Sequence, residues 1–424
     1  MQDTLSIINM FCPLRDYNPF RRTSTSRLLS VYAEVIPYLN SQDLVTCSVL
    51  SKHFYQQTVQ YLWKSPQFYQ ISHIHSELYM FNRFLSHLPN ARRSTQEKIE
   101  HINLSTIQER LYDRVNPDFF RLLVLHAPNL RSLNLSSASF FHCRSLPTGA
   151  WSLSRLTDLD LSNCPNVTDD MMVTIARSCR QVAHLKLNRL FRHKGRGLAA
   201  FAAECDHLST VELIDNTSLG DEGVVALAKF RHIHLHQLDL SGCSELTSTS
   251  LQILGKYCAH LQVLSLAGVC GLQLDDLKKL SCIRNKTTDL DLSRSALRPI
   301  DIAQWISQIE LNGLVQLCID FEVILIILRQ QFFIRAPKLT HLILSNASQH
   351  IHISFLYDLI HMLPQLNRIV VEKQDVETGF LLDSYQARDE LTTETAQAFN
   401  CRQSNVAVEM RIKKHMDNLN LEEW

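Results

Sequence analysis

The sequence predicts an α/β repeat solenoid, a curved horseshoe with parallel strands on its inner side and helices on its outer side. The first observation is a recurring apolar triplet, as in Leu156, Leu159 and Leu161, which suits one buried face of a short strand. The second is the period, because the triplet returns about every 26 residues. The third is helical spacing between triplets, as in Leu251 and Leu254.

The residue that opens each triplet is almost always apolar. Successive openers lie 25–27 residues apart, except the first two, which lie 31 apart because of an insertion around residues 109–116. One strand, turn and helix cannot bury its own apolar face, so neighbouring repeats must stack. The predicted openers of about eleven strands are Ile99, Leu130, Leu156, Val182, Leu208, Leu235, Leu261, Thr287, Leu314, Leu339 and Leu366.

Cysteines mark equivalent places in the repeats. Five of them stand three residues before an opener or eight after one: Cys179, Cys205, Cys258, Cys164 and Cys243. With the turn at 164–169, these positions resemble the cysteine-containing class of leucine-rich repeats. The resemblance covers roughly residues 68–372.

Composition narrows the classes of function. The 424 residues carry 42 basic and 42 acidic side chains, and this balance argues against a nucleic-acid partner. The twelve cysteines include no C-x-x-C pair, so we expect free thiols, no structural zinc and a cytoplasmic or nuclear protein. The apolar run Phe321–Phe333 is too short for a membrane span and is interrupted by Arg329, so we expect no membrane segment.

Four segments are predicted in chain order. Residues 1–26 have no periodicity and are expected to be a mobile leader. Residues 27–66 carry two or three short helices, with Ser41 as a possible N-cap. Residues 67–372 form the solenoid. Residues 373–424 are expected to form a C-terminal cap and tail, with one last strand around Val406–Ile412.

The helical segment 27–66 resembles an F-box. The resemblance rests on Val35-Ile36, Tyr38-Leu39, Asp43-Leu44, Cys47, Leu50-Ser51-Lys52 and the closing run 62–66. The sequence differs from the family pattern at Leu28-Leu29-Ser30, at Pro37 and at Phe54. An F-box followed by leucine-rich repeats is a common architecture.

The resemblance implies a substrate receptor of a cullin-based (SCF-type) ubiquitin ligase. The F-box would bind a Skp-type adaptor, and a single solenoid would hold an unidentified target protein. The alternative is a protein-interaction scaffold outside any ligase, whose N-terminal helices only cap the first repeat. The adaptor contacts implied are Leu28, Leu29, Val35, Ile36, Tyr38, Leu39, Asp43, Leu44, Leu50, Lys52, Phe54 and Trp63.

Strand residues two, four and six positions after each opener should line the concave face. Acidic residues dominate them, which indicates a basic or hydroxyl-rich partner, although solvated strand faces also need polar residues. The candidates are Asp158, Asp160, His184, Lys186, Glu212, Gln237, Asp239, Asp289, Asp291, Asp320 and His341.

Two further features of the sequence are candidate sites, one for a partner and one for a metal. A basic edge loop carries Phe191, Arg192, Lys194 and Arg196, and is either a partner contact or an ordinary solvated loop. The alternating residues His232, His234 and His236 could bind a metal, but the first two precede the strand, so no metal site is expected.

Sequence motifs of catalysis are absent. The chain has no G-x-S-x-G, no Gly-rich phosphate loop, no H-E-x-x-H and no paired Cys/His signature. The same-face pairs Asp158/Asp160 and Asp289/Asp291 lie on single strands, where no pocket is expected around them. We therefore expect a binding protein without enzymatic activity or cofactor.

Overall fold

The computed structural model forms two compact units, Met1–Leu208 and Ser209–Trp424. It describes residues 35–68, 76–107, 115–116, 118–147, 151–231, 233–280, 286–347, 354–374 and 407–413. The predicted leader 1–26 lies outside these residues, as does most of 373–424. The boundary between the units falls within the stretch for which the sequence predicts one solenoid.

A helical module opens the first unit. Its elements are η1 (Ile36–Tyr38), α3 (Ser41–Ser48) and α4 (Lys52–Lys64). The segment between this module and the first strand carries α5 (Glu77–His87), η2 (Leu88–Asn90) and α6 (Arg93–Gln96). The predicted N-cap of α3 is wrong by one residue, because Asn40 Oδ1 accepts a hydrogen bond from the Asp43 amide at 2.9 Å. Helix α6 lies in the polar stretch 91–98, and its Gln96 is buried and donates to the Leu88 carbonyl.

Short parallel strands and helices alternate through the rest of the first unit. The elements are β1 (His101–Asn103), α7 (Phe119–His126), β2 (Ser132–Asn134), η3 (Cys143–Ser145), β3 (Asp158–Asp160), α8 (Asp169–Ser178), β4 (His184–Lys186) and α9 (Arg196–Glu204). The register places the middle residue of each strand beside that of the next, so Leu133 pairs with Leu159 and Leu159 with Leu185.

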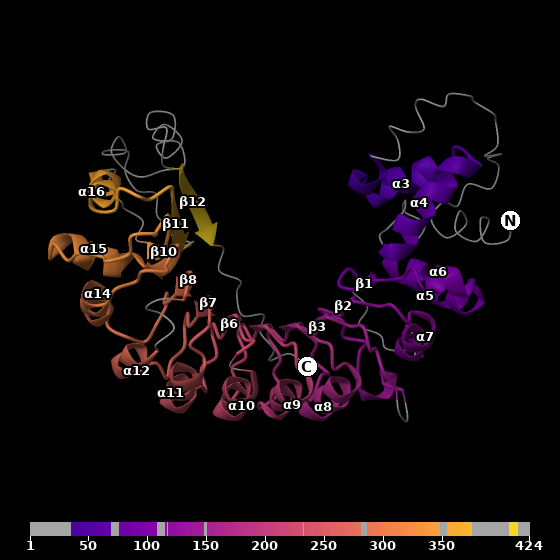
Figure 1. Cartoon of the computed structure of the whole chain (residues 1–424), viewed down its shortest axis with the longest axis horizontal. Helices are drawn as coiled ribbons and strands as arrows, with labels where there is room; N and C mark the ends of the chain where they lie inside the picture. The colour runs from indigo at the N-terminus through magenta and orange to yellow at the C-terminus, as the bar shows by residue number, and fades with distance from the viewer. Residues whose placement is uncertain are drawn as a thin grey trace, which may run out of the picture. The chain divides into compact units, whose positions relative to one another are not determined.

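The second unit repeats the same alternation. Its elements are β5 (Thr210–Glu212), α10 (Asp221–Arg231), β6 (Gln237–Asp239), α11 (Ser248–Tyr257), β7 (Val263–Ser265), α12 (Leu274–Lys279), β8 (Asp289–Asp291), α14 (Pro299–Gln308), β9 (Gln316–Asp320), α15 (Phe321–Arg329), β10 (His341–Ala347), α16 (Ser354–Met362), β11 (Arg368–Gln374) and β12 (Ala407–Lys413). Each strand pairs in parallel with the next. Within this unit the helices follow the outer side of a bend and the strands its inner side (Figure 1).

The predicted fold class is confirmed. Every strand from β1 to β11 begins two residues after its predicted opener, and β12 is shifted by one residue from the predicted last strand. The openers are buried, including the polar Thr287, whose Oγ1 donates to the Leu261 carbonyl at 3.1 Å. That hydrogen bond removes the cost of burying an unpaired hydroxyl.

The turns after strands β3 to β6 are built in the same way. A residue with positive φ follows the strand in successive repeats, at Asn163 (57°), Arg189 (55°), Asp215 (57°) and Gly242 (71°). Its amide donates to a carbonyl of the next repeat, as from Asn163 to Asn188 at 2.8 Å and from Gly242 to Ala267 at 2.7 Å. Buried backbone groups of one turn are thus satisfied by its neighbour.

Leu238→Ala tests the assignment of inward and outward strand positions. Leu238 is fully buried, so its truncation should lower the free energy of unfolding by about 2–5 kcal/mol. Gln237→Ala, one residue earlier on the solvent-facing side of the same strand, is the control. It should change the free energy of unfolding by less than about 0.5 kcal/mol. Urea unfolding followed by circular dichroism measures both, and equal losses would contradict the assignment.

Candidate binding surfaces

The helical module has its own small core. Ile36, Leu44 and Leu62 are buried together, and Leu39 packs against them half-buried. Of the residues implied as adaptor contacts, Ile36 and Leu44 are therefore inside this core, and Trp63 is buried against Phe84 of α5, so none of the three is available to a partner. Leu28 and Leu29 lie outside the described residues.

Other predicted contacts lie on the surface of this module. Tyr38 is 88% exposed, Leu50 50% and Val35 43%. Asp43 and Lys52 are also exposed, and Phe54 is half-buried. Residues 35–50 thus carry three of the ten large apolar side chains that are exposed in the described part of the chain. Such a concentration is typical of a surface that a partner covers.

Aromatic packing joins the module to the first repeats. The Trp63 and Phe84 rings lie 6.1 Å apart, and Phe68 packs edge-on against Phe81 and Phe84 at 5.1 and 5.3 Å. Phe81 in turn contacts Phe119 of α7 at 6.1 Å. Because these rings are almost fully buried, the module is held on the repeats by a continuous core.

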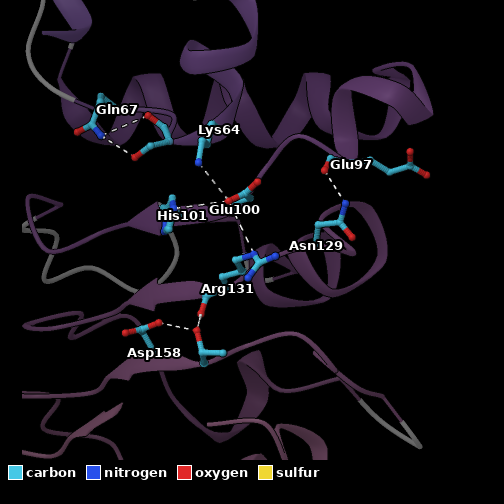
Figure 2. A network of polar contacts seen from close by, with 10 residues as sticks. Lys64, Gln67, Glu97, Glu100, His101, Asn129, Arg131 and Asp158 are labelled. Carbon is cyan, nitrogen blue, oxygen red and sulfur yellow. Dashed lines mark hydrogen bonds and ion pairs between the residues drawn. The ribbon is translucent and has the colours of Figure 1, made fainter. Parts of the chain in front are cut away.

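A polar network covers the same junction (Figure 2). The Glu100 carboxylate lies 3.4 Å from Lys64 Nζ and 3.8 Å from Arg131 Nε. All three side chains are at least 31% exposed, so these ion pairs contribute little to stability. Backbone hydrogen bonds along the same path, from the Glu100 amide to the Lys64 carbonyl and from the Arg131 amide to the Glu100 carbonyl, fix the geometry more firmly.

The aspartates of the strand face have local structural roles. Asp160, Asp239 and Asp291 each accept the amide two residues later, at 2.9 Å, and so close the turn that follows their strand. In the first two repeats asparagine does the same, because Asn103 and Asn134 accept from Ser105 and Ser136. Part of the acidic stripe therefore has a structural role in closing the turns.

The remaining acidic positions are also hydrogen-bonded. Thr157 Oγ1 donates to Asp158 at 2.5 Å, and Thr288 Oγ1 donates to Asp289 at 2.6 Å. Asp320 accepts the Arg294 amide at 3.0 Å. Of the other candidates, His184 and Lys186 are exposed, while Gln237, His341 and the acidic Glu212 are half-buried.

A hollow of about 230 Å³ opens on the strand face of the second unit. Of the predicted residues it brings together Asp239, Asp289 and Asp291, but not Glu212, Gln237, Asp320 or His341. Hydroxyl groups of Ser241, Ser265, Ser293 and Ser345 complete its wall. The lining suits the insertion of a basic side chain hydrogen-bonded by carboxylates and hydroxyls.

Two charged residues of the lining are not among the predicted ones. Glu372 accepts from Ser345 Oγ at 2.9 Å and lies six positions after the opener Leu366, so the rule used for the other strands would have identified it. Arg294 lies beyond the strand, at the positive-φ turn, and no strand rule would select it.

Burial governs the titration of this face. It raises the pKa of Asp239, and the carboxylates of Asp291 and Glu212 raise it further. Burial likewise raises the pKa of Asp320, with the charge of Asp291 acting in the same direction. Cys318 lines the hollow, but burial raises its pKa to about 12, so its thiol is protonated and a poor nucleophile at neutral pH.

The edge loop between β4 and α9 presents all four of its predicted residues to solvent. Phe191 is 57% exposed, and Arg192 and Lys194 are exposed as well. Arg196 is exposed but pairs with Asp170 at 2.6 Å.

The described residues show neither a metal site nor a membrane-spanning helix. They contain no group of three histidine, cysteine, aspartate or glutamate residues that could hold a metal ion, and His232 lies outside them. Within the same residues, no helix has the length and apolar character needed to cross a membrane.

Comparisons with known proteins give distant similarities. No protein-family model matches the chain. Antagonist of mitotic exit network protein 1 from Saccharomyces cerevisiae is 23% identical over 273 residues, which cover 57% of this chain and 45% of that protein, so the chain spans less than half of that relative. The crystal structure of the Rad7 and Elc1 complex in yeast matches with a TM-score of 0.47 and 16% identity, over 89% of this chain and 100% of that one.

Asp239→Asn and Asp239→Ala separate charge from turn closure. Because the pKa of Asp239 is raised in the folded state, its charge opposes folding, and its contribution to stability is lost as pH rises through that pKa. Asparagine keeps the acceptor for Ser241, so Asp239→Asn should increase the free energy of unfolding at about pH 7, and by less at about pH 4. Asp239→Ala should lower it by about 1 kcal/mol at both.

Urea unfolding at the two pH values measures these effects. A loss of stability in Asp239→Asn as large as that in Asp239→Ala would show that the carboxylate charge itself supports the fold.

Proposed function

We propose that the chain is a non-catalytic substrate receptor of a cullin-based ubiquitin ligase, acting in the cytoplasm, the nucleus or both. Its helical module would bind a Skp-type adaptor, and its strand face would bind a target protein. One observation carries the proposal: Val35, Tyr38 and Leu50 are exposed on a module whose core is already closed by Ile36, Leu44 and Leu62. These exposed residues are not needed to complete the core.

The junction supports the same role. A receptor must hold its target at a defined position relative to the adaptor, because the ligase transfers ubiquitin to whichever lysine it can reach. The Trp63–Phe84 contact joins α4 to α5, and backbone hydrogen bonds at Glu100 join the end of α4 to the segments beside β1 and β2.

The strand face supports target binding. The hollow of the second unit is lined by Asp239, Asp289, Asp291 and Glu372 against the single basic residue Arg294. It would therefore take a lysine or arginine side chain of the target, with serine hydroxyls as further acceptors.

A scaffold outside any ligase is the second candidate. The packing of Trp63 and Phe68 on Phe81 and Phe84 is what a repeat-capping segment requires. Capping and adaptor binding use different residues of the module, so only a binding measurement separates the two functions.

Binding of the full chain to a purified Skp-type adaptor tests the proposal. Tyr38→Asp/Leu50→Asp places two charges on the exposed apolar surface and should weaken binding by about 3 kcal/mol, or roughly a hundredfold in Kd, because two contacts are lost. Leu44→Asp is unsuitable, because Leu44 is buried and its replacement would unfold the module. Titration calorimetry measures the affinity.

Leu125→Asp/Phe230→Asp provides the matched control. Both residues are exposed, at 54% and 57%, and lie outside the module, so this variant should bind the adaptor like wild type. Circular dichroism checks that both variants fold. Folded wild-type protein without adaptor affinity would favour the scaffold function.

A further inference from the structure

The edge loop of the first unit differs from the equivalent loops of other repeats in the type of side chain that it exposes to solvent. In this repeat the two positions after the first buried turn residue are Phe191 and Arg192. In four other repeats they are small or uncharged, or carry one acid: Pro165-Asn166, Thr217-Ser218, Ser244-Glu245 and Cys270-Gly271. In the repeat of β2 they are Ser139-Phe140, but there the aromatic ring is buried. The repeat pattern itself does not call for an aromatic and a basic residue at this place.

The inward positions of the loop keep the scaffold of the repeat. Arg189 has a φ of 55°, like Asn163 at the equivalent place one repeat earlier. Leu190 and His193 are fully buried, as Cys164 and Val167 are in that repeat. The inward positions therefore stay buried, although His193 replaces Val167, while the outward positions become aromatic and basic.

The loop is braced by the start of the preceding helix. The Asp169 carboxylate accepts the Lys194 amide at 2.9 Å and the Gly197 amide at 2.7 Å. Asp170 next to it pairs with Arg196 at 2.6 Å. The loop is therefore preorganised, and a partner that binds it would lose little affinity to the entropy cost of ordering the loop.

The charge of the loop surface is positive. In the described part of the chain, no carboxylate pairs with Arg192 or Lys194, whereas Arg196 is neutralised by Asp170. Nucleic-acid binding through the backbone commonly engages on the order of 6–10 phosphates, and two available cations on a chain of zero net charge are too few. An aromatic side chain beside two cations instead fits a short peptide.

We propose that the edge loop binds an acidic peptide segment of a partner protein. One apolar side chain of the segment would cover the Phe191 ring, and its carboxylate or phosphate groups would pair with Arg192 and Lys194. This inference does not depend on adaptor binding, so the two proposals can fail separately.

Fluorescence anisotropy of the full chain with labelled peptides tests this surface. The first probe has glutamates on both sides of a leucine, the second has phosphoserines in place of the glutamates, and the third has glutamines. We expect binding of the first or second probe, weakened about tenfold by raising the salt concentration, and little binding of the third. The two acidic probes distinguish carboxylates from phosphates as the recognised group.

Two variants place the binding on the loop. Arg192→Glu/Lys194→Glu should abolish binding of the acidic probes, and Phe191→Ser should weaken it about tenfold. Arg155→Glu/Arg177→Glu makes the same change in net charge at exposed positions of the same unit and should bind like wild type. Circular dichroism verifies that each variant folds.

Three outcomes would overturn the proposal. The first is that no acidic probe binds the folded wild-type chain. The second is that both double variants lose binding equally, since the effect would then come from net charge and not from this loop. The third is that the chain binds phosphatidylserine vesicles through Phe191 but neither acidic peptide, which would make the loop a membrane contact.

Discussion

Stacking of neighbouring repeats is the constraint on which the whole structure depends. A three-residue strand such as Gln237–Asp239 contributes one central leucine to the core and leaves most of its backbone groups to be paired by adjacent strands. The turns depend on the same stacking, because the Leu240 amide reaches the Ser265 carbonyl and the Gly242 amide the Ala267 carbonyl. Each repeat is therefore stable only beside another.

The ends of such a stack need a different solution. At the N-terminal end, the apolar faces of the first repeats are closed by aromatic rings from Trp63 to Phe119. The same helical module keeps Tyr38 and Leu50 in solvent. One short segment can thus cap the repeats with one set of side chains and offer another set to a partner.

The acidic strand face shows how fold and binding share residues. Asp239 closes a turn through the Ser241 amide and also lines the hollow, although burial makes its charge unfavourable. Asn134 closes the equivalent turn without a charge. Turn closure therefore needs a hydrogen-bond acceptor but not a carboxylate. The structural role of Asp239 is thus distinct from a role of its charge in attracting a basic partner.

The repeat architecture could be predicted from the sequence, because the period near 26 residues and the apolar triplets identify the buried faces of strands and helices. The sequence could not show which residues of the strand face lie in contact with one another, since that depends on packing between repeats. Only the tertiary structure showed that Leu44 is buried while Leu50 is exposed, although both fit the F-box pattern equally well. It also brought Glu372 to the hollow, because hydrogen bonding across strands joins residues far apart in the chain.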